Sequence, residues 1–293
     1  MNKLTEWDVQ YFLLLLVLLS SFSAVQAKEP LYYFQVDHRY NYRTALLELA
    51  LSYTPNDKTE ESISLLPEAN IPMARATYLM AKNKIRGVVS LATTHEREAE
   101  LLAIKIPIMA GILGMRVLLI HQSQQQQFSS INDKEQLKHY VAGFGEHWGD
   151  LSILKENGIS VLPVAKYSSL FEMLNAQRFD FFPRGVNEIF SEFEIYKEQF
   201  PDLSIEKSLA IYYPYPVYFF VAKQDETIAQ RIELGLEKAL VDGRFKQLFL
   251  RHHKDLLQKL NFGKRAIFNL SNDSLPKDAQ IDNMDWWLQS KAE

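Results

Sequence analysis

The fold is decided by the stretch Ile85–Arg97, which reads IRGVVSLATTHER. The apolar residues of Val88–Leu91 predict a buried strand, and Thr94 stands where it can cap a short acidic helix start. Open α/β sheets bind small anions at the carboxyl ends of their strands. Backbone amides, two hydroxyls and the guanidinium of Arg97 at this place would suit an anion site, although these residues alone do not decide for it. The alternative is an ordinary helix cap with Arg97 paired to a nearby surface glutamate.

The chain begins with features of an export signal. Lys3 precedes the apolar run Tyr11–Leu19, and Val25–Ala27 supplies the small residues that a signal peptidase recognises. The run is shorter than the roughly 20 apolar residues that span a bilayer. We expect cleavage after Ala27 and a protein located in the periplasm. An uncleaved anchor is the alternative, because two acidic residues make the leader less basic than usual.

Composition excludes several classes of function. The chain has 293 residues, no cysteine and a formal net charge of −4. Without cysteine we expect no disulfide, no thiolate nucleophile, no cysteine-based metal site and no lipidated-cysteine anchor. A mildly acidic chain lacks the basic face that nucleic acid requires, so we expect no nucleic-acid partner. The length suits one large domain or two lobes.

Strands and helices alternate along the rest of the chain, which predicts an α/β fold with a mostly parallel sheet. The glutamine tract Gln124–Gln127 predicts an exposed loop. The predicted strands are 31–34, 62–66, 85–91, 115–120, 141–143, 159–164, 179–182 and 217–221. The predicted helices are 45–53, 72–82, 134–139, 150–156, 169–176 (capped by Ser168 or Ser169), 187–200 and 228–249, the last interrupted by Asp242-Gly243.

Two such sets of elements predict two lobes, with crossovers near Leu118–Gln122 and near Tyr213–Tyr218. The paired tryptophans Trp286 and Trp287 need a surface to pack on. We therefore expect the C-terminal tail to wrap a lobe, with a docking site for a partner as the alternative. The predicted parts are a signal peptide (1–27), a first lobe (28–120 and 214–260), a second lobe (121–213) and a C-terminal extension (261–293).

Several of these segments resemble the periplasmic solute-binding proteins of the amino-acid class, the family 3 type. Thr94–Arg97 resembles the family's Thr-x-Glu-Arg turn, and Ile104–Ile108 keeps the proline of its Phe-Ser-x-Pro-Tyr segment. Tyr167–Asp180 looks like its helix followed by a Gly-Arg-x-Asp-Ala strand, and Val241–Gly243 like the Asp-Gly turn of its final helix pair. The points follow the family's order over residues 30–255. The resemblance implies a two-lobed periplasmic-binding-protein-like type II fold with a double-crossover hinge.

The resemblance also implies ligand-binding residues in the first lobe. Arg97 would grip a ligand carboxylate through its two-pronged guanidinium, beside Thr94. The backbone carbonyls around Ser90 and Ala92 would accept hydrogen bonds from a ligand ammonium group. We also expect Tyr42 to line the cleft, because aromatic residues are dense after the first strand and such residues often line ligand sites.

The second lobe departs from the family's pattern. Its turn Gly143–Asp150 keeps glycines that let backbone amides approach a ligand, but it adds His147 and Trp148. These two either narrow the cleft or lie in a loop with Trp148 buried. Arg184 stands where the family places an acidic residue for the ligand's ammonium group, and a guanidinium cannot accept a hydrogen bond. Arg184 either faces the cleft, which favours an acidic ligand, or pairs with Glu188.

We interpret the chain as an exported solute-binding protein that captures a small, acidic, carboxylate-bearing ligand for uptake through an ABC-type membrane permease. The alternatives are a ligand-sensing module for a membrane receptor and, less favoured, an enzyme on the same fold. The sequence contains no helical His-Glu-x-x-His motif, no Gly-x-Ser-x-Gly elbow and no phosphate-binding glycine loop with lysine. We therefore expect no catalytic residue, no metal, no cofactor and a monomer.

Overall fold

The computed structural model describes residues 31–35, 38–54, 63–65 and 71–280, all within the compact unit Leu31–Glu293. Two predicted features lie outside the described residues: the signal peptide (1–27) and the tryptophan pair at 286–287. Within those ranges, no helix combines the length and the apolar character needed to cross a bilayer.

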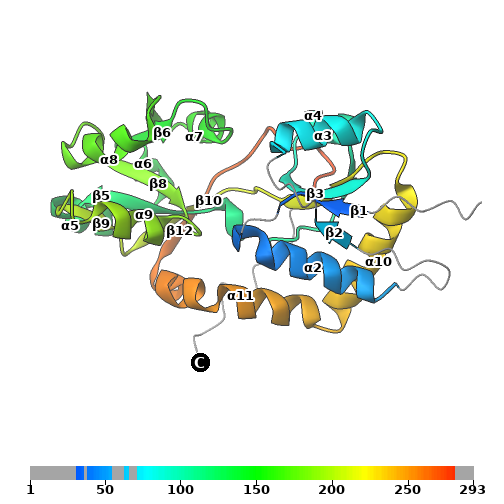
Figure 1. The fold of residues 1–293 in the computed structure, drawn as a ribbon. Helices are drawn as coiled ribbons and strands as arrows, with labels where there is room; N and C mark the ends of the chain where they lie inside the picture. Colours follow the sequence, from blue (N-terminus) through cyan, green and yellow to red (C-terminus); the bar gives the residue numbers. More distant parts are fainter. Residues whose placement is uncertain (1–30, 36–37, 55–62, 66–70, 281–293) are drawn as a thin grey trace, which may run out of the picture. The chain divides into compact units, whose positions relative to one another are not determined.

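The first sheet has five strands in the order β2-β1-β3-β11-β4 (Figure 1). β1 (Leu31–Tyr33) pairs in parallel with β2 (Ile63–Leu65) and with β3 (Gly87–Ala92). β11 (Val217–Val221), whose five residues are all buried, runs antiparallel between β3 and β4 (Leu102–Ile104). A strand from late in the sequence therefore forms the middle of a sheet that is otherwise built from the beginning of the chain.

Three long helices pack around this sheet. α2 (Asn41–Ser52) lies against α10 (Glu226–Val241) and α11 (Arg244–Leu260). Gly235 of α10 allows the close approach, because a Cβ atom at this position would overlap the backbone carbonyl of Ala50 in α2. α10 and α11 are separated at Gly243, whose φ of 82° is the left-handed conformation that glycine adopts without strain. The predicted break at Asp242-Gly243 is confirmed.

The second sheet has seven strands. β12 (Ala266–Asn269), β10 (Leu209–Tyr212), β5 (Met115–His121), β8 (Phe181–Gly185), β6 (Val141–Gly145) and β7 (Ser160–Val164) follow one another, and β9 (Leu203–Ile205) pairs with β5. The remaining helices are α3 (Met73–Ala81), α4 (His95–Glu100), α5 (Gln125–Ser129), α6 (Lys134–Leu137), α7 (Leu151–Glu156), α8 (Tyr167–Asn175) and α9 (Ile189–Tyr196).

The first crossing between the sheets lies earlier than predicted. The chain leaves the first sheet at the end of β4 and enters the second at β5, so the connection spans 105–114. The predicted crossover at Leu118–Gln122 is wrong, because most of that segment belongs to β5, which pairs with β8, β9 and β10. The chain returns to the first sheet between Tyr212 and Val217.

The C-terminal extension packs on the second sheet and then reaches back to the first. β12 pairs in parallel with β10 at the edge of the second sheet. Farther along, Asp278 forms an ion pair with Lys105, and the hydroxyl of Tyr218 in β11 donates to the carbonyl of Gln280 at 2.7 Å. Figure 1 shows the red segment after β12 running from one sheet toward the other. The chain therefore links the two sheets through more segments than the two crossovers expected.

Two local predictions fail for physical reasons. The glutamine tract is not a loop but the 3-10 turn Gln122–Gln124 followed by α5, which the buried Phe128 anchors. α8 begins at Tyr167, so the predicted caps Ser168 and Ser169 lie inside the helix, and Lys166 at the N-cap makes no side-chain cap. The other predicted elements occur with shifted ends, and the short strands β4, β9, β10 and β12 were not predicted.

Candidate functional site

The Thr94–Arg97 turn has the predicted local geometry. Thr94 caps α4, and its side-chain oxygen accepts a hydrogen bond from the backbone N–H of Arg97 at 3.2 Å. The guanidinium of Arg97 folds back and donates to the carbonyl of Ala92 at the end of β3. Among the described residues, Arg97 forms no ion pair with a carboxylate. The alternative of an Arg97–glutamate pair is therefore not what the structure contains.

Ser90 is occupied by the protein itself. It is buried, its backbone N–H donates to Gln35 Oε1 at 2.6 Å, and its carbonyl accepts from Gln35 Nε2 at 2.9 Å. Its hydroxyl lies 3.1 Å from the Tyr33 hydroxyl. The Ser90 carbonyl thus already accepts one hydrogen bond from within the protein, and its contact with a ligand ammonium group stays a prediction.

Arg43 also lies on this edge, and sequence reasoning missed it. It stands in the first turn of α2, and its Nη1 donates to Ser90 Oγ at 3.2 Å. Its guanidinium lies 4.9 Å from the centre of the Tyr40 ring, and its Nε is buried without a hydrogen-bond partner. Burial lowers the pKa of Arg43, and the neighbouring tyrosines oppose this only in part. Among the described residues Arg43 has no carboxylate partner.

Tyr42 is a core residue and not part of a cleft. It is 5% exposed, and its hydroxyl donates to the carbonyl of Ile108 at 2.9 Å. Its ring packs edge-on against Phe249 and His253 of α11. The predicted ligand contact is therefore wrong, because α2 turns Tyr42 inward together with Leu46, one helical turn later.

A polar pocket lies at the carboxyl ends of β6 and β8. Its volume is about 410 Å³, and it contains the three second-lobe residues predicted from sequence, His147, Trp148 and Arg184. Neither Arg97 nor Thr94 lines it. The other lining residues are Arg116, Phe144, Gly149, Asp150, Glu188 and Tyr215. The structure thus brings together one half of the predicted site, with additional charged residues around it.

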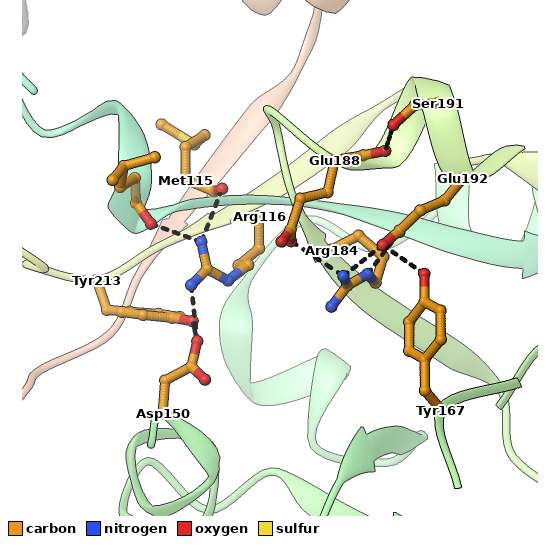
Figure 2. A network of polar contacts seen from close by, with 10 residues as sticks. Met115, Arg116, Asp150, Tyr167, Arg184, Glu188, Ser191, Glu192 and Tyr213 are labelled. Atoms are coloured by element: carbon orange, nitrogen blue, oxygen red, sulfur yellow. Dashed lines mark hydrogen bonds and ion pairs between the residues drawn. The ribbon is translucent and has the colours of Figure 1, made fainter. Parts of the chain in front are cut away.

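Arg184 is buried and neutralised within the protein (Figure 2). Its Nε donates to Glu192 Oε2 at 2.6 Å, and Nη2 bonds the other oxygen of the same carboxylate. Nη2 also lies 3.0 Å from Glu188, while the Tyr167 hydroxyl donates to Glu192 at 2.7 Å. Burial alone would lower the pKa of Arg184, but its acidic partners outweigh burial and raise that pKa. The predicted Glu188 pair is present, and the dominant partner is Glu192.

Arg116 forms a second neutralised pair on the same pocket (Figure 2). Its Nη2 donates to Asp150 Oδ2 at 2.6 Å, and the hydroxyl of Tyr213 donates to the same oxygen. Burial alone would raise the pKa of Asp150, but Arg116 and Tyr213 outweigh it and hold that pKa below its ordinary value. Both pocket arginines are therefore balanced by carboxylates of the second sheet and its connections.

Trp148 forms a wall of the pocket while it packs on the core. Its half-buried ring lies stacked 6.0 Å from Phe182 and edge-on to Phe144, with the Arg184 guanidinium 4.6 Å from its centre. Gly145 makes room for it, because a Cβ atom there would lie 2.4 Å from the Trp148 ring. Gly143 and Gly145 lie inside β6 beneath aromatic rings and do not face a ligand, whereas Gly149 lines the pocket and its role toward a ligand stays a prediction. His147 is exposed beside the pocket.

One of the two missed arginines left a signal in the sequence. Arg116 is the one charge in the apolar run 115–120, and a charge in a buried strand requires a partner. Arg43 left no such signal, because the predicted helix 45–53 begins after it and only the structure places it in the first turn of α2, where the helix dipole disfavours a cation. The described residues contain no group of three or more His, Asp or Glu side chains placed to hold a metal ion.

Comparisons with known proteins bear on the fold. No family model matches the chain, and no curated protein sequence matches it. The second substrate-binding domain of a protein described as an amino acid ABC transporter, from Streptococcus pneumoniae, is 16% identical with a TM-score of 0.50, over 75% of this chain and 97% of that chain.

Two other solved structures have TM-scores below 0.5. An ancestral arginine-binding protein bound to glutamine is 15% identical, with a TM-score of 0.47 over 76% of this chain and 97% of that one. A Salmonella typhimurium periplasmic binding protein with high arginine specificity is 14% identical, with a TM-score of 0.44 over 75% and 97%. Together with the strand order of the two sheets, the streptococcal domain shows that this chain has the periplasmic-binding-protein-like fold of type II.

Proposed function

We propose that this protein is an exported, monomeric solute-binding protein that captures a small carboxylate-bearing solute between two lobes and delivers it to a membrane permease. Binding is reversible and involves no chemical step. The observation that carries the proposal is the geometry of Arg97, which follows the Thr94 cap at the end of β3 and forms no ion pair among the described residues. Burial and Asp150 raise the pKa of Tyr215, which lines the pocket, and the nearby Arg97 opposes that rise only in part.

The charge of Arg97 supports the acidic part of the proposal. Its guanidinium is partly buried, it is bound to one carbonyl, and it has no carboxylate partner among the described residues. A guanidinium binds a carboxylate through two parallel hydrogen bonds, so Arg97 can orient a solute as well as attract it. The sequence predicts an acidic ligand from Arg97 and Arg184 together, but in the structure Glu192 neutralises Arg184, so the prediction depends on Arg97.

The pocket on the second sheet supplies shape and polarity. Trp148 offers an aromatic wall, Glu188 an exposed carboxylate, and the buried Arg116–Asp150 pair a neutral floor. Closure of such a fold about its connecting segments would remove the solute from water and strengthen its polar contacts. The volume of about 410 Å³ falls within the usual range for small-molecule sites.

A thermal-shift screen tests the proposal. The protein is unfolded, washed free of co-purified solute and refolded, and then screened with acidic, neutral and basic amino acids and with dicarboxylates. A solute at 100 times its Kd adds about 2.7 kcal/mol to the free energy of unfolding, which raises Tm by roughly 5–10 °C. We expect acidic compounds to give such shifts. Stabilisation by neutral or basic amino acids alone would refute the acidic ligand, and no stabilisation by any compound would refute the binding role.

The Arg97→Ala variant tests the proposed contact. We expect it to fold normally and to lose about 10- to 100-fold in affinity by calorimetry for whichever acidic compound the screen returns. Arg75→Ala is the matched control, because Arg75 is an exposed arginine of α3, which precedes Arg97 in the N-terminal part of the chain. Unchanged affinity in the Arg97 variant would remove Arg97 from the site.

A further inference from the structure

Two arginines lie along one edge of β3. β3 pairs antiparallel with β11, and in such a pair alternate residues turn their N–H and C=O groups away from the partner strand. Ser90 turns both groups toward Gln35, so the carbonyl of Ala92, two residues later, faces the same side. Arg43 contacts Ser90, and Arg97 contacts Ala92. The two anchoring residues are about 7 Å apart along the strand.

Neither guanidinium forms an ion pair with a carboxylate among the described residues; Glu96, the residue before Arg97, is near enough only for Arg97 to help lower its pKa. The groups around Arg43 are the hydroxyl and carbonyl of Ser90 and the face of the Tyr40 ring, all of them neutral. The Nε of Arg43 is buried with a free donor, which is costly unless a hydrogen-bond acceptor arrives from outside. Arg97 is likewise bound to a single carbonyl. Two cations therefore stand at the carboxyl end of one strand, and neither forms an ion pair with a described carboxylate.

We infer that Arg43 is a second anion-binding residue of this protein, and that Arg43 and Arg97 together bind a solute carrying two negative charges. The inference rests on the proposed solute-binding function and specifies which residues read the solute's charge. A compact dianion and an extended dicarboxylate share the chemistry that the two guanidinium groups recognise. The experiment therefore includes one of each.

The test uses the full chain, freed of co-purified solute, and titrates sodium sulfate and disodium succinate by thermal shift against sodium chloride at matched ionic strength. We expect both dianions to stabilise the wild type more than chloride does. Arg43→Gln should bind the better dianion at least about tenfold more weakly, as should Arg97→Gln, whereas the exposed control Arg75→Gln should match the wild type. A larger thermal shift with sulfate indicates a compact solute, and a larger shift with succinate indicates an extended one.

The outcomes separate this inference from the proposed function. Equal dianion binding by wild type and Arg43→Gln overturns the role of Arg43, while loss in Arg97→Gln alone leaves the solute-binding proposal intact. If the wild type shows no dianion response although single-charged compounds stabilise it, the two-charge inference fails and the function stands. If Arg43→Gln does not fold, the Nε–H resonance of Arg43 in the wild type decides, because it must shift when sulfate is added.

Asp37 provides a further control. It lies outside the described residues and is an acid close in sequence to Arg43. We expect Asp37→Asn to bind dianions within about threefold of the wild type. Binding tightened at least about tenfold by this variant would mean that Asp37 neutralises Arg43, and it would overturn the inference.

Discussion

Arg43 and Arg97 on the first sheet differ from Arg116 and Arg184 on the second in what surrounds their charge. The second-sheet pair are 9% and 7% exposed, and each is held by a buried carboxylate of the protein. The first-sheet pair are only partly buried, and carbonyls, hydroxyls and an aromatic ring hold them. An arginine at a pocket is therefore not by itself an anion site. Its existing partners decide whether its charge remains available.

The arginines of the two sheets therefore have different roles. On the second sheet the ion pairs hold the pocket wall in place. The paired Arg184 guanidinium lies over the Trp148 ring, and the Arg116–Asp150 pair connects β5 with the start of α7. On the first sheet the strand edge presents two guanidinium groups that form no ion pair with a carboxylate in the described part of the chain.

Removing the acid from a second-sheet pair should be the most damaging change. Glu192→Ala leaves Arg184 buried without its main partner, and breaking a buried pair in this way costs about 3–5 kcal/mol. Urea unfolding followed by circular dichroism measures the free energy of unfolding. Glu194→Ala, which removes an exposed acid paired with Lys197, is the control and should cost less than about 0.5 kcal/mol. A loss below about 1 kcal/mol in the Glu192 variant would contradict the buried pair.

Asp150 should make stability depend on acid pH. Its pKa in the folded protein is below its unfolded value of about 3.9, so the unfolded state binds more protons as the pH falls. The stabilisation is complete above the unfolded pKa and is lost as the pH drops through the folded pKa. Asp150→Asn should lose about 2–3 kcal/mol at pH 7 and show a smaller further loss between pH 5 and pH 2. Parallel Tm–pH curves for variant and wild type would contradict this.

His253, which lies near Arg43, should also make the free energy of unfolding depend on pH. Burial lowers its pKa to about 4, and Arg43 and His252 add to this effect, although a hydrogen bond with the Phe249 carbonyl opposes it. The unfolded state therefore takes up the proton first, and stability should rise from pH 4 to pH 6.5. Partial exposure reduces the gain to roughly 2 kcal/mol. His253→Gln should flatten the urea-unfolding profile over this range; an unchanged slope would show that His253 titrates normally.

Removing a first-sheet arginine should change stability least. Arg43→Gln deletes a cation that has no carboxylate partner among the described residues, so the free energy of unfolding should stay within about 1 kcal/mol of the wild type. Urea unfolding at low ionic strength is the measurement. A loss comparable to that of Glu192→Ala would mean that Arg43 is compensated like the second-sheet pair, and the comparison between the sheets would fail.

Much of the fold could be predicted because it follows from local patterns. β11 occurs over the predicted residues 217–221, Thr94 caps α4 as its spacing indicates, and Gly243 separates α10 from α11. β12 was missed because its four residues bury only Phe268 and its partner strand β10 lies more than 50 residues earlier. A short edge strand is specified by that partner and not by its own pattern.

The site was harder to predict because its charges are balanced through space. Helical spacing predicts a pair between Arg184 and Glu188. In the structure β8 continues to Gly185, and the turn that follows it brings Glu192 of α9 into contact with the Arg184 guanidinium. Arg43 and Ser90 are 47 residues apart in the chain. Sequence could identify charged residues near strand ends; it could not tell which of them the protein would neutralise.

A sulfate titration of the ¹⁵N-arginine-labelled protein, followed by NMR of the Nε–H groups, would show which arginines are available to an anion. We predict that the resonances of Arg43 and Arg97 shift together and saturate, while those of Arg116 and Arg184 stay in place because their carboxylate partners already hold them. Saturating shifts at Arg116 and Arg184, with Arg43 and Arg97 unmoved, would contradict the account.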